Sequence, residues 1–179
     1  MCIKELSLKG VYLIEPNFIS DNRGFFSRTF CKNEFSKMGL ATEFPQWSIS
    51  HNKKKNTIRG MHFQKPPHEE IKLITCTKGG IYDVLVDLRE GSETYKKWIS
   101  VELTETNKHS LYVPGGIAHG FKTLLDDTDV FYHISEFYHP EYSSGVLYND
   151  EAFGIEWGNL DGLVISEKDL AWTNSRTLS

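Results

Sequence analysis

The chain is organised around the stretch Arg59-Gly60-Met61-His62-Phe63-Gln64-Lys65-Pro66-Pro67-His68-Glu69-Glu70-Ile71-Lys72. Residues 58–64 are predicted to form a strand, in which alternate side chains share a face. His62 then points to one face and Arg59 to the opposite one. A histidine that faces the interior of a β-barrel is a candidate general base or metal ligand, whereas the plainer interpretation is a hydrogen-bonded core histidine.

The sequence on both sides of this stretch alternates between apolar and polar residues, as β-strands do. Clear alternation predicts strands at residues 71–77, 81–88, 99–103, 111–113 and 130–134. Weaker patterns predict strands at residues 44–50 and 56–64. Residues 6–14 are predicted to form strands on both sides of a turn at Lys9-Gly10, and a strand at residues 25–30 is predicted to follow a turn at Asp21-Asn22-Arg23-Gly24. Short strands separated by Gly, Asn and Asp turns indicate a β-sandwich or barrel.

Two short helices are predicted. The first has Asn33 as its N-cap, residues 34–38 as its body and Gly39 as its C-terminal stop. The second begins at Ser166, where Ser166-Glu167-Lys168-Asp169 has the form of a capping box with aspartate in the fourth place.

Length and composition favour one β-rich domain. The 179 residues fit a single domain, residues 1–179, and 13% aromatic residues with 14 glycines favour strands over helices. A formal net charge of -4 argues against a protein that binds nucleic acid or a membrane surface. No apolar run approaches the roughly 18 residues that a membrane span needs.

The cysteines point to a reducing compartment. Cys2, Cys31 and Cys76 are odd in number and widely spaced, which indicates neither a disulfide framework nor a zinc knuckle. The N-terminal residues also lack a signal-peptide pattern. We therefore expect a cytoplasmic protein.

A motif late in the chain is typical of cupins. The motif P-x-G-x-x-H is matched by Pro114-Gly115-Gly116-Ile117-Ala118-His119. The other cupin motif offers H-x-H, but this chain has His62-Phe63-Gln64, so one metal ligand is missing. A metal site would have to use His62, His119 and Glu69 or Glu70, which is a depleted set of ligands.

Further motifs occur in a shared order along nearly the whole chain: Asp21-x-Arg23-Gly24-x-Phe26, Arg59-Gly60-x-His62-Phe63-Gln64, Pro66-Pro67-His68, Asp83-Val84-x-Val86-Asp87-Leu88-Arg89, Pro114-x-Gly116-x-Ala118-His119-Gly120-Phe121, Tyr138-x-Pro140 and Ser166-Glu167-Lys168-Asp169. Together they resemble the dTDP-4-dehydrorhamnose 3,5-epimerase family, a branch of the cupins. The resemblance implies a mainly β fold, the cupin double-stranded β-helix or jelly-roll barrel, with a few short helices, one of them near the C-terminus.

The resemblance also implies a reaction, the epimerisation of a nucleotide-linked 4-keto-6-deoxy sugar in deoxysugar and polysaccharide biosynthesis. The protons at C3 and C5 are acidic because both carbons flank the C4 ketone. Epimerisation requires a base on one face of the sugar, an acid on the other and a cation for the enolate oxygen. Neither a redox cofactor nor a metal is expected.

The resemblance assigns the catalytic roles to residues of this chain. His62 matches the family's base, Tyr132 the acid and Lys72 the cation, and Asp169 matches an aspartate that orients the histidine. The plainer alternatives are a core tyrosine at position 132 and an aspartate that only decorates a helix at position 169. Further positions that match substrate contacts in the family are Arg23, Phe26, Gln46, Arg59, His119, Tyr138 and Lys168.

The chain departs from the family pattern on the nucleotide side. Arg28 and Ser143 replace glutamates, and Ser48 replaces an asparagine. A carboxylate accepts hydrogen bonds from a base or ribose, whereas arginine only donates. One hypothesis is therefore a weaker preference for thymine than is usual in the family.

Several functions stay open at this point. The main interpretation is an epimerase that inverts C3 and C5 of a dTDP-linked sugar. The alternatives are a C3-only or C5-only epimerase acting on a CDP- or GDP-linked sugar, a metal-dependent cupin, and a cupin that binds sugar nucleotides without converting them. The resemblance further implies a homodimer in which the N-terminal segment reaches the neighbouring subunit.

Overall fold

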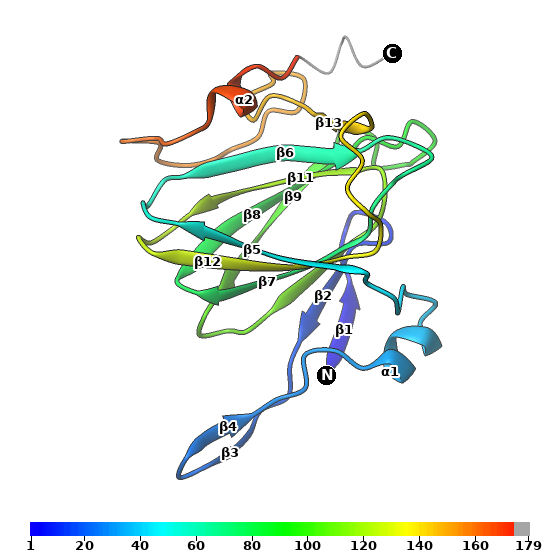
Figure 1. Ribbon diagram of the computed structural model, residues 1–179, viewed down its shortest axis with the longest axis vertical. Helices are drawn as coiled ribbons and strands as arrows, with labels where there is room; N and C mark the ends of the chain where they lie inside the picture. The colour runs from blue at the N-terminus through cyan, green and yellow to red at the C-terminus, as the bar shows by residue number, and fades with distance from the viewer. Residues whose placement is uncertain (174–179) are drawn as a thin grey trace.

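Alternating apolar side chains build two antiparallel sheets that pack face to face in the computed structural model, which describes residues 1–173 (Figure 1). The six-stranded sheet has the order β1 (Cys2–Glu5), β2 (Tyr12–Glu15), β10 (Ser110–Val113), β7 (Lys72–Lys78), β12 (Thr128–Ile134) and β5 (Gln46–Asn52). The five-stranded sheet has the order β13 (Ser143–Gly145), β6 (Ile58–Gln64), β11 (Ile117–Thr123), β8 (Gly80–Asp87) and β9 (Trp98–Thr104). The predicted mainly β jelly-roll architecture is thus confirmed.

The core lies between the two sheets. Leu85 and Phe121 from one sheet meet Ile74 and Val130 from the other, and all four side chains are buried. Each strand predicted after residue 40 is present, with ends within two residues of those expected. Within residues 6–14 the predicted turn at Lys9-Gly10 is confirmed, but the strand before it, β1, ends at Glu5, and the strand after it, β2, begins at Tyr12.

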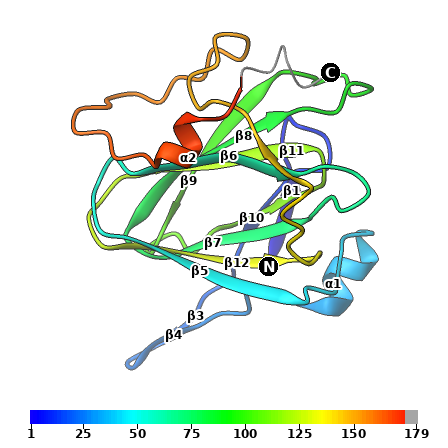
Figure 2. The ribbon, with the colours of Figure 1, turned by 45° about the horizontal axis from the view of Figure 1, so that its top comes forward.

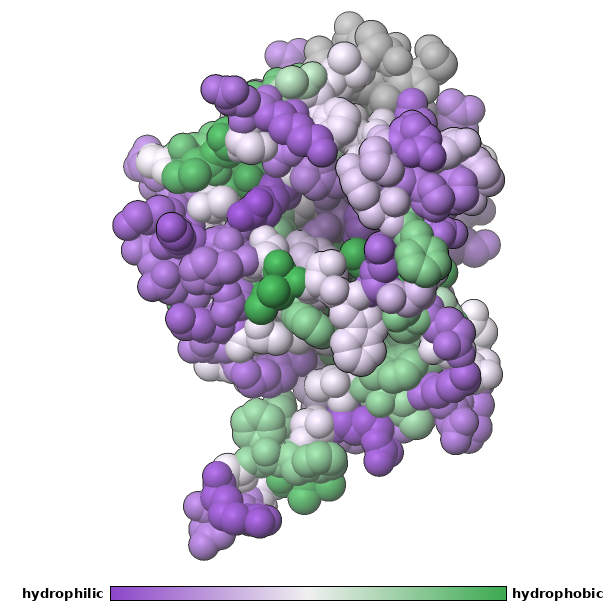
Figure 3. Space-filling model, viewed as in Figure 1, coloured by the Kyte–Doolittle hydropathy of each residue, from purple (hydrophilic) through white to green (hydrophobic). Residues whose placement is uncertain are grey.

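A small hairpin projects from the body of the molecule. It consists of β3 (Ile19–Asp21) and β4 (Gly24–Phe26), which pair with each other and with no other strand among residues 1–173 (Figure 1). The turn predicted at residues 21–24 is confirmed, whereas the strand predicted at residues 25–30 ends early, at Phe26. Apolar side chains of this hairpin are open to solvent, with Ile19 71% and Phe26 68% exposed, and Figure 3 shows them on the part nearest the body.

The first helix, α1 (Lys32–Lys37), begins two residues before the predicted body, so the assignment of Asn33 as N-cap is wrong. Cys31 precedes the helix in an extended conformation and makes no side-chain cap bond. Packing of Phe35 against Phe30 and Tyr112 fixes the helix instead. The second helix, α2 (Glu167–Leu170), confirms its prediction, because the Ser166 side chain accepts a hydrogen bond from the Asp169 backbone N–H. No helix within residues 1–173 is long and apolar enough to cross a membrane.

The strand β6 contains one extra residue relative to β11. His62 lies opposite His119 and Arg59 lies opposite Phe121, so two residues of β6, at positions 60 and 61, lie opposite one residue of β11, at position 120. Such a β-bulge interrupts the alternation of side chains. Arg59 therefore shares the inward face with His62, and the prediction that the two point to opposite faces is wrong.

Gly60 makes this bulge possible. Its φ is +133°, and a Cβ atom there would lie 2.5 Å from the Cα atom of Gly120 on β11. Only glycine tolerates both the backbone conformation and the close approach of the two strands. Any substitution at position 60 would displace the two strands that carry His62 and His119.

The chain between β13 and α2 covers the outer face of the five-stranded sheet. Phe153 and Trp157 pack there against Ile58 and Met61 of β6. The buried Lys122 ammonium of β11 fastens the segment by donating to the backbone carbonyls of Trp157 and Asn159. This segment leads directly into α2, which lies over β6 (Figure 2).

Asp87 at the end of β8 organises the following loop and carries a prediction about acid stability. The buried carboxylate accepts hydrogen bonds from the side chains of Arg89, Ser92 and Thr94. Burial favours its neutral form, but these hydrogen bonds outweigh burial and hold the pKa of Asp87 well below its usual range. Because the pKa is lower in the folded than in the unfolded state, the stabilisation is complete above about pH 4 and is lost as pH falls through the folded pKa.

We expect Asp87→Asn to lower the free energy of unfolding at pH 7 by about 2–3 kcal/mol, the cost of losing charged hydrogen bonds. The deficit relative to the parent should shrink steadily as the pH is lowered below about 4. Urea denaturation at several pH values measures both effects. Glu93→Gln, which alters an exposed carboxylate of the same loop, is the control and should leave stability nearly unchanged. An acid-independent deficit would contradict the assignment.

Candidate active site

Strand register places the candidate residues on the inner faces of the two sheets. Directly opposed residues of antiparallel strands share a face. His62 opposes His119, and Asp83 of β8 opposes Phe121, whose side chain lies in the core between the sheets. His119 and Phe121 are two apart on β11, so the histidines and Asp83 also face inward.

The six-stranded sheet contributes from the other side. Tyr132 of β12 opposes Ile74 of β7, which is a residue of the core between the sheets. Lys72 shares this face, because it is two residues from Ile74 along β7. The predicted base and the predicted acid therefore stand on opposite sheets and face the same interior.

Asp169 from α2 holds His62 in place. The Oδ1 atom of Asp169 lies 2.6 Å from Nε2 of His62, and Oδ2 accepts a hydrogen bond from the Gly60 backbone N–H at 3.3 Å. Burial raises the pKa of Asp169, but the hydrogen bond and the charge of His62 outweigh burial and keep the pKa below its usual range. Because the carboxylate can only accept, Nε2 of His62 carries the hydrogen, and Nδ1 keeps the lone pair that can take a proton.

A second histidine–aspartate pair lies deeper in the barrel. His119 Nε2 is 2.9 Å from Asp83 Oδ2, and both residues are buried. Burial raises the pKa of Asp83 above its usual range, although His119 and Lys72 act in the opposite direction. Within residues 1–173 the Oδ1 atom of Asp83 has no hydrogen-bond partner, which leaves an acceptor directed into the interior.

Tyr132 is held in its neutral form. Its ring centroid lies 6.0 Å from that of His119. Burial raises the pKa of Tyr132 far above its usual value, and the nearby Asp83 adds to this effect, while Arg59 partly opposes it. A neutral phenol is a proton donor, which is the state that the predicted acid requires.

Two cations border this space. The buried Lys72 ammonium lies 2.7 Å from Glu70 Oε1 and donates to the backbone carbonyl of His62 at 3.3 Å. Arg59 donates from Nε to the Asn52 side-chain oxygen at 2.6 Å and from Nη2 to the His51 carbonyl at 3.3 Å. The two cations can therefore attract an anionic ligand or a developing enolate.

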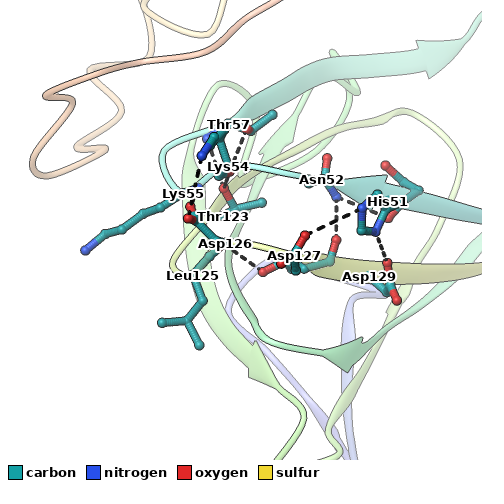
Figure 4. A network of polar contacts seen from close by, with 12 residues as sticks. His51, Asn52, Lys54, Lys55, Thr57, Thr123, Leu125, Asp126, Asp127 and Asp129 are labelled. Atoms are coloured by element: carbon teal, nitrogen blue, oxygen red, sulfur yellow. Dashed lines mark hydrogen bonds and ion pairs between the residues drawn. The ribbon is translucent and has the colours of Figure 1, made fainter.

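Asn52 at the end of β5 is the residue that positions Arg59. It is buried, and its amide group donates to the carbonyls of Ser50 and Thr128, which leaves its oxygen for the arginine. Figure 4 shows Asn52 beside His51, whose ring is hydrogen-bonded to Asp129. The sequence gives no signal for this role, because the contact joins two strands of different sheets.

We expect Asn52→Ala to weaken the binding of dTDP about 5- to 20-fold, because the Arg59 guanidinium loses its fixed orientation. Calorimetric titration of the parent, Asn52→Ala, Arg59→Lys and the double variant forms a double-mutant cycle that isolates the coupling. The double variant should bind no worse than Arg59→Lys alone. Fully additive losses would mean that Asn52 only supports the strands.

Three more predicted substrate residues lie on different segments around the barrel. Gln46 of β5 opposes Ile134, and its side-chain oxygen accepts a hydrogen bond from the Tyr138 backbone N–H at 2.9 Å. The Tyr138 side chain is 56% exposed, so its ring is free to contact a ligand. Lys168 precedes Asp169 in α2, and its ammonium lies over the Trp172 ring.

Two predicted substrate residues do not lie at this site within the chain. Arg23 and Phe26 lie on the projecting β3–β4 hairpin, and Arg23 is paired with Asp21 of the same hairpin. The positions that depart from the family pattern are also separated. Ser48 opposes Tyr132 and Ser143 opposes Gln64, whereas Arg28 lines a groove of about 500 Å³ together with Phe44, Trp47 and His133.

Sequence reasoning assigned no role to Asp83 or Trp172 and considered Glu70 only as a candidate metal ligand. Asp83 interrupts an otherwise apolar strand, and this was the available signal, since a buried charge needs a partner. Glu70 forms an ion pair with Lys72, two residues away, and the sequence alone does not show that these two residues pair. Trp172 donates from Nε1 to Asp169 at 3.4 Å, and its ring lies edge-on to His62 with centroids 6.0 Å apart.

The arrangement agrees with comparisons to known proteins. The family model for dTDP-4-dehydrorhamnose 3,5-epimerase matches residues 5–176. The chain is 42% identical over 168 residues to the dTDP-4-dehydrorhamnose 3,5-epimerase of Methanothermobacter thermautotrophicus, covering 93% of this chain and 90% of the relative. The crystal structure of the Elizabethkingia anophelis enzyme of that name superposes with a TM-score of 0.94 at 36% identity, covering 98% of this chain and 97% of that one. A Legionella pneumophila dTDP-6-deoxy-D-glucose-3,5-epimerase, in complex with dTDP-4-keto-L-rhamnose, superposes with a TM-score of 0.93 at 31% identity, covering 99% and 94% of the two chains.

Proposed function

Because this chain belongs to the dTDP-4-dehydrorhamnose 3,5-epimerase family, we propose that it inverts C3 and C5 of dTDP-4-dehydro-6-deoxyglucose to give dTDP-4-dehydrorhamnose. One observation carries the proposal. His62, oriented by Asp169, and neutral Tyr132 face one interior from opposite sheets. A base and an acid on opposite sides of one carbon are what inversion requires.

The proposed mechanism begins with the loss of a proton from C3 or C5 to Nδ1 of His62. The electron pair moves to the C4 oxygen, where Lys72 stabilises the enolate as it forms. Tyr132 then gives its proton to the same carbon from the opposite side. His62 has gained a proton and Tyr132 has lost one, so both must exchange with water before the second carbon reacts. The His62 side chain is 41% exposed, which gives it access to solvent for this exchange.

Incubation of the sugar nucleotide with the enzyme in heavy water, followed by proton NMR, tests the function. Deuterium should enter at both C3 and C5 and both centres should invert. Exchange confined to one carbon would replace the proposal with a single-carbon epimerase. Binding without any exchange would indicate a sugar-nucleotide-binding protein. CDP- and GDP-linked analogues should react more slowly than the dTDP-linked sugar.

We further propose a homodimer in which the β3–β4 hairpin supplies Arg23 and Phe26 to the site of the partner. The projection of the hairpin, its exposed apolar side chains and its lack of strand pairing with its own body support this arrangement. The family resemblance assigns nucleotide contacts to these two residues. A closed two-fold dimer would give each site one hairpin from the other subunit.

Complementation between inactive variants tests the exchange of hairpins. We expect His62→Asn and the double variant Arg23→Ala/Phe26→Ala each to be nearly inactive alone. After unfolding and refolding as an equal mixture, half of the dimers should be mixed, and each of these contains one complete site. Activity should therefore return to about a quarter of the parent value. Mixed dimers that form but stay inactive would show that the hairpin does not complete a partner's site.

We propose a cytoplasmic location, because the cysteines form no disulfide bonds among residues 1–173. Cys2, Cys31 and Cys76 are all free thiols in the structure. Cys76 is buried, and burial raises its pKa to about 11, so it stays a thiol that packs in the core. Thiols of this kind suit a reducing compartment.

A further inference from the structure

Two loops meet beside the barrel and bring a pair of histidines together. His68 lies in the loop between β6 and β7, and His139 lies in the segment between β12 and β13. Their rings are stacked, with centroids 3.6 Å apart and an interplanar angle of 24°. Glu136 Oε1 lies 3.7 Å from His139 Nε2. One side-chain nitrogen or oxygen from each of these three residues lies within 4.8 Å of the others, and all three residues are half-buried.

The backbone around this cluster, His68/Glu136/His139, is fixed by Gln64. The buried Gln64 amide donates to the carbonyls of His68 and Phe137, at 2.9 and 3.1 Å, and its oxygen accepts from the His139 backbone N–H at 2.7 Å. Lys65 also donates from its backbone N–H to the Tyr142 carbonyl at 2.9 Å. The two loops are thus held together without help from the histidine side chains, which stay available to bind.

No lysine or arginine in the described part of the chain forms an ion pair with Glu136. Its Oε1 atom accepts only from the Phe137 backbone N–H besides the contact with His139. A second carboxylate, Glu141, lies 3.7 Å from the other ring nitrogen of His139. Two imidazoles with adjacent carboxylates form a donor set that favours Zn²⁺ and related transition metals over Ca²⁺ or Mg²⁺.

We propose that His68, Glu136 and His139 bind one Zn²⁺ ion, with water as the fourth ligand. Tetrahedral ligation requires the ligand atoms to lie about 3.3 Å apart. The ligand atoms already lie within 4.8 Å of one another, so each separation must close by at most about 1.5 Å, which rotation of half-buried side chains permits. The ion takes no part in the proton transfers proposed for His62 and Tyr132.

A bound ion would act on the loop that carries Tyr138. This residue precedes His139 directly, and its backbone N–H is held by Gln46. By binding Glu136 and His139, which lie on either side of Tyr138 in the sequence, zinc would add a second restraint on the same loop. The site would therefore restrain the loop that carries Tyr138, one of the predicted substrate residues, in a metal-dependent way.

Calorimetric titration of the full-length protein with Zn²⁺ tests the site. One ion per chain should bind with a dissociation constant in the micromolar range or below, and His68→Ala and His139→Ala should each weaken it at least 100-fold. Glu136→Gln should weaken it about 10-fold. His51→Ala is the matched control, because His51 also lies against a carboxylate, Asp129, but outside the cluster, and it should leave affinity unchanged. Circular dichroism verifies that each variant is folded.

Two further variants separate this site from the barrel interior. His62→Asn and His119→Asn should both retain zinc affinity. Loss of binding in either of them, with retention in His68→Ala, would place the ion in the interior and overturn the proposal. Parent binding weaker than about 1 mM, or unchanged in all three cluster variants, would overturn it as well, since zinc then binds only adventitiously.

Discussion

His62→Asn should abolish deuterium exchange at both C3 and C5 while leaving the fold and dTDP binding intact. Removal of a general base costs about 10²–10⁴-fold in rate, and the loss is larger when no second base reaches the carbon. The structure offers none in the right place, because the other inward-facing histidine, His119, is already paired with Asp83. Asparagine is close to histidine in size, so the strand pairing of β6 with β11 should survive. The readout is the NMR exchange rate at each carbon.

Asp169→Asn is the companion variant, because it removes the charge but keeps the size. It should reduce exchange less than His62→Asn does, since the imidazole stays in place but loses the partner that fixes its protonated nitrogen. Calorimetric titration with dTDP monitors ligand binding in both variants. Exchange at a near-parental rate in His62→Asn would remove the histidine from the mechanism.

Tyr132→Phe should separate exchange from inversion. The phenyl ring preserves the packing beside Val130 and Ile74, so stability should change little. His62 can still remove a proton and return one to the same face, so deuterium should continue to enter without inversion. We expect the rate of inversion to fall by about 10²–10⁴-fold at one or both carbons, because the donor on the opposite face is gone.

NMR coupling constants of the product distinguish retained from inverted centres at C3 and C5. Tyr112→Phe is a matched control, because Tyr112 is also a buried tyrosine but lies in a different core cluster, where its hydroxyl accepts from the Ala41 backbone N–H. The Tyr112→Phe variant should have a lower free energy of unfolding but should invert C3 and C5 at the parental rate. Inversion at the parental rate in Tyr132→Phe would make Tyr132 a packing residue only.

Much of the fold is readable from the sequence because strand alternation is a local property. The strands β5 to β10 and β12 follow directly from period-two patterns, whereas β11 (Ile117–Thr123) was not predicted, and α2 follows from its serine cap. The predicted start of α1 was wrong, because the packing of Phe35 in the core, rather than a polar cap, determines where the helix begins. The hairpin β3–β4 is shorter than its apolar pattern suggests, because no other strand within residues 1–173 pairs with it.

The site is less readable, because its contacts join residues that are far apart in the chain. The family resemblance correctly placed Asp169 against His62, although 107 positions separate them and no local pattern links the two. The pair of Arg59 and Asn52 escaped prediction because it spans both sheets. The predicted orientation of Arg59 was wrong for a different reason. Whether Arg59 faces the interior depends on the bulge in β6, which residue types alone do not reveal.

That bulge makes the glycine at position 60 as important as the polar residues on either side of it. Positions before Gly60 that face the interior have odd numbers, and positions after it have even numbers. A substitution at position 60 that removed the bulge at unchanged strand length would restore regular alternation and turn the arginine out of the barrel, although every polar group of the site would still be encoded. Loss of this glycine is therefore equivalent to the loss of a binding residue, and a comparison of sequences that considers only the polar groups of the site would overlook it.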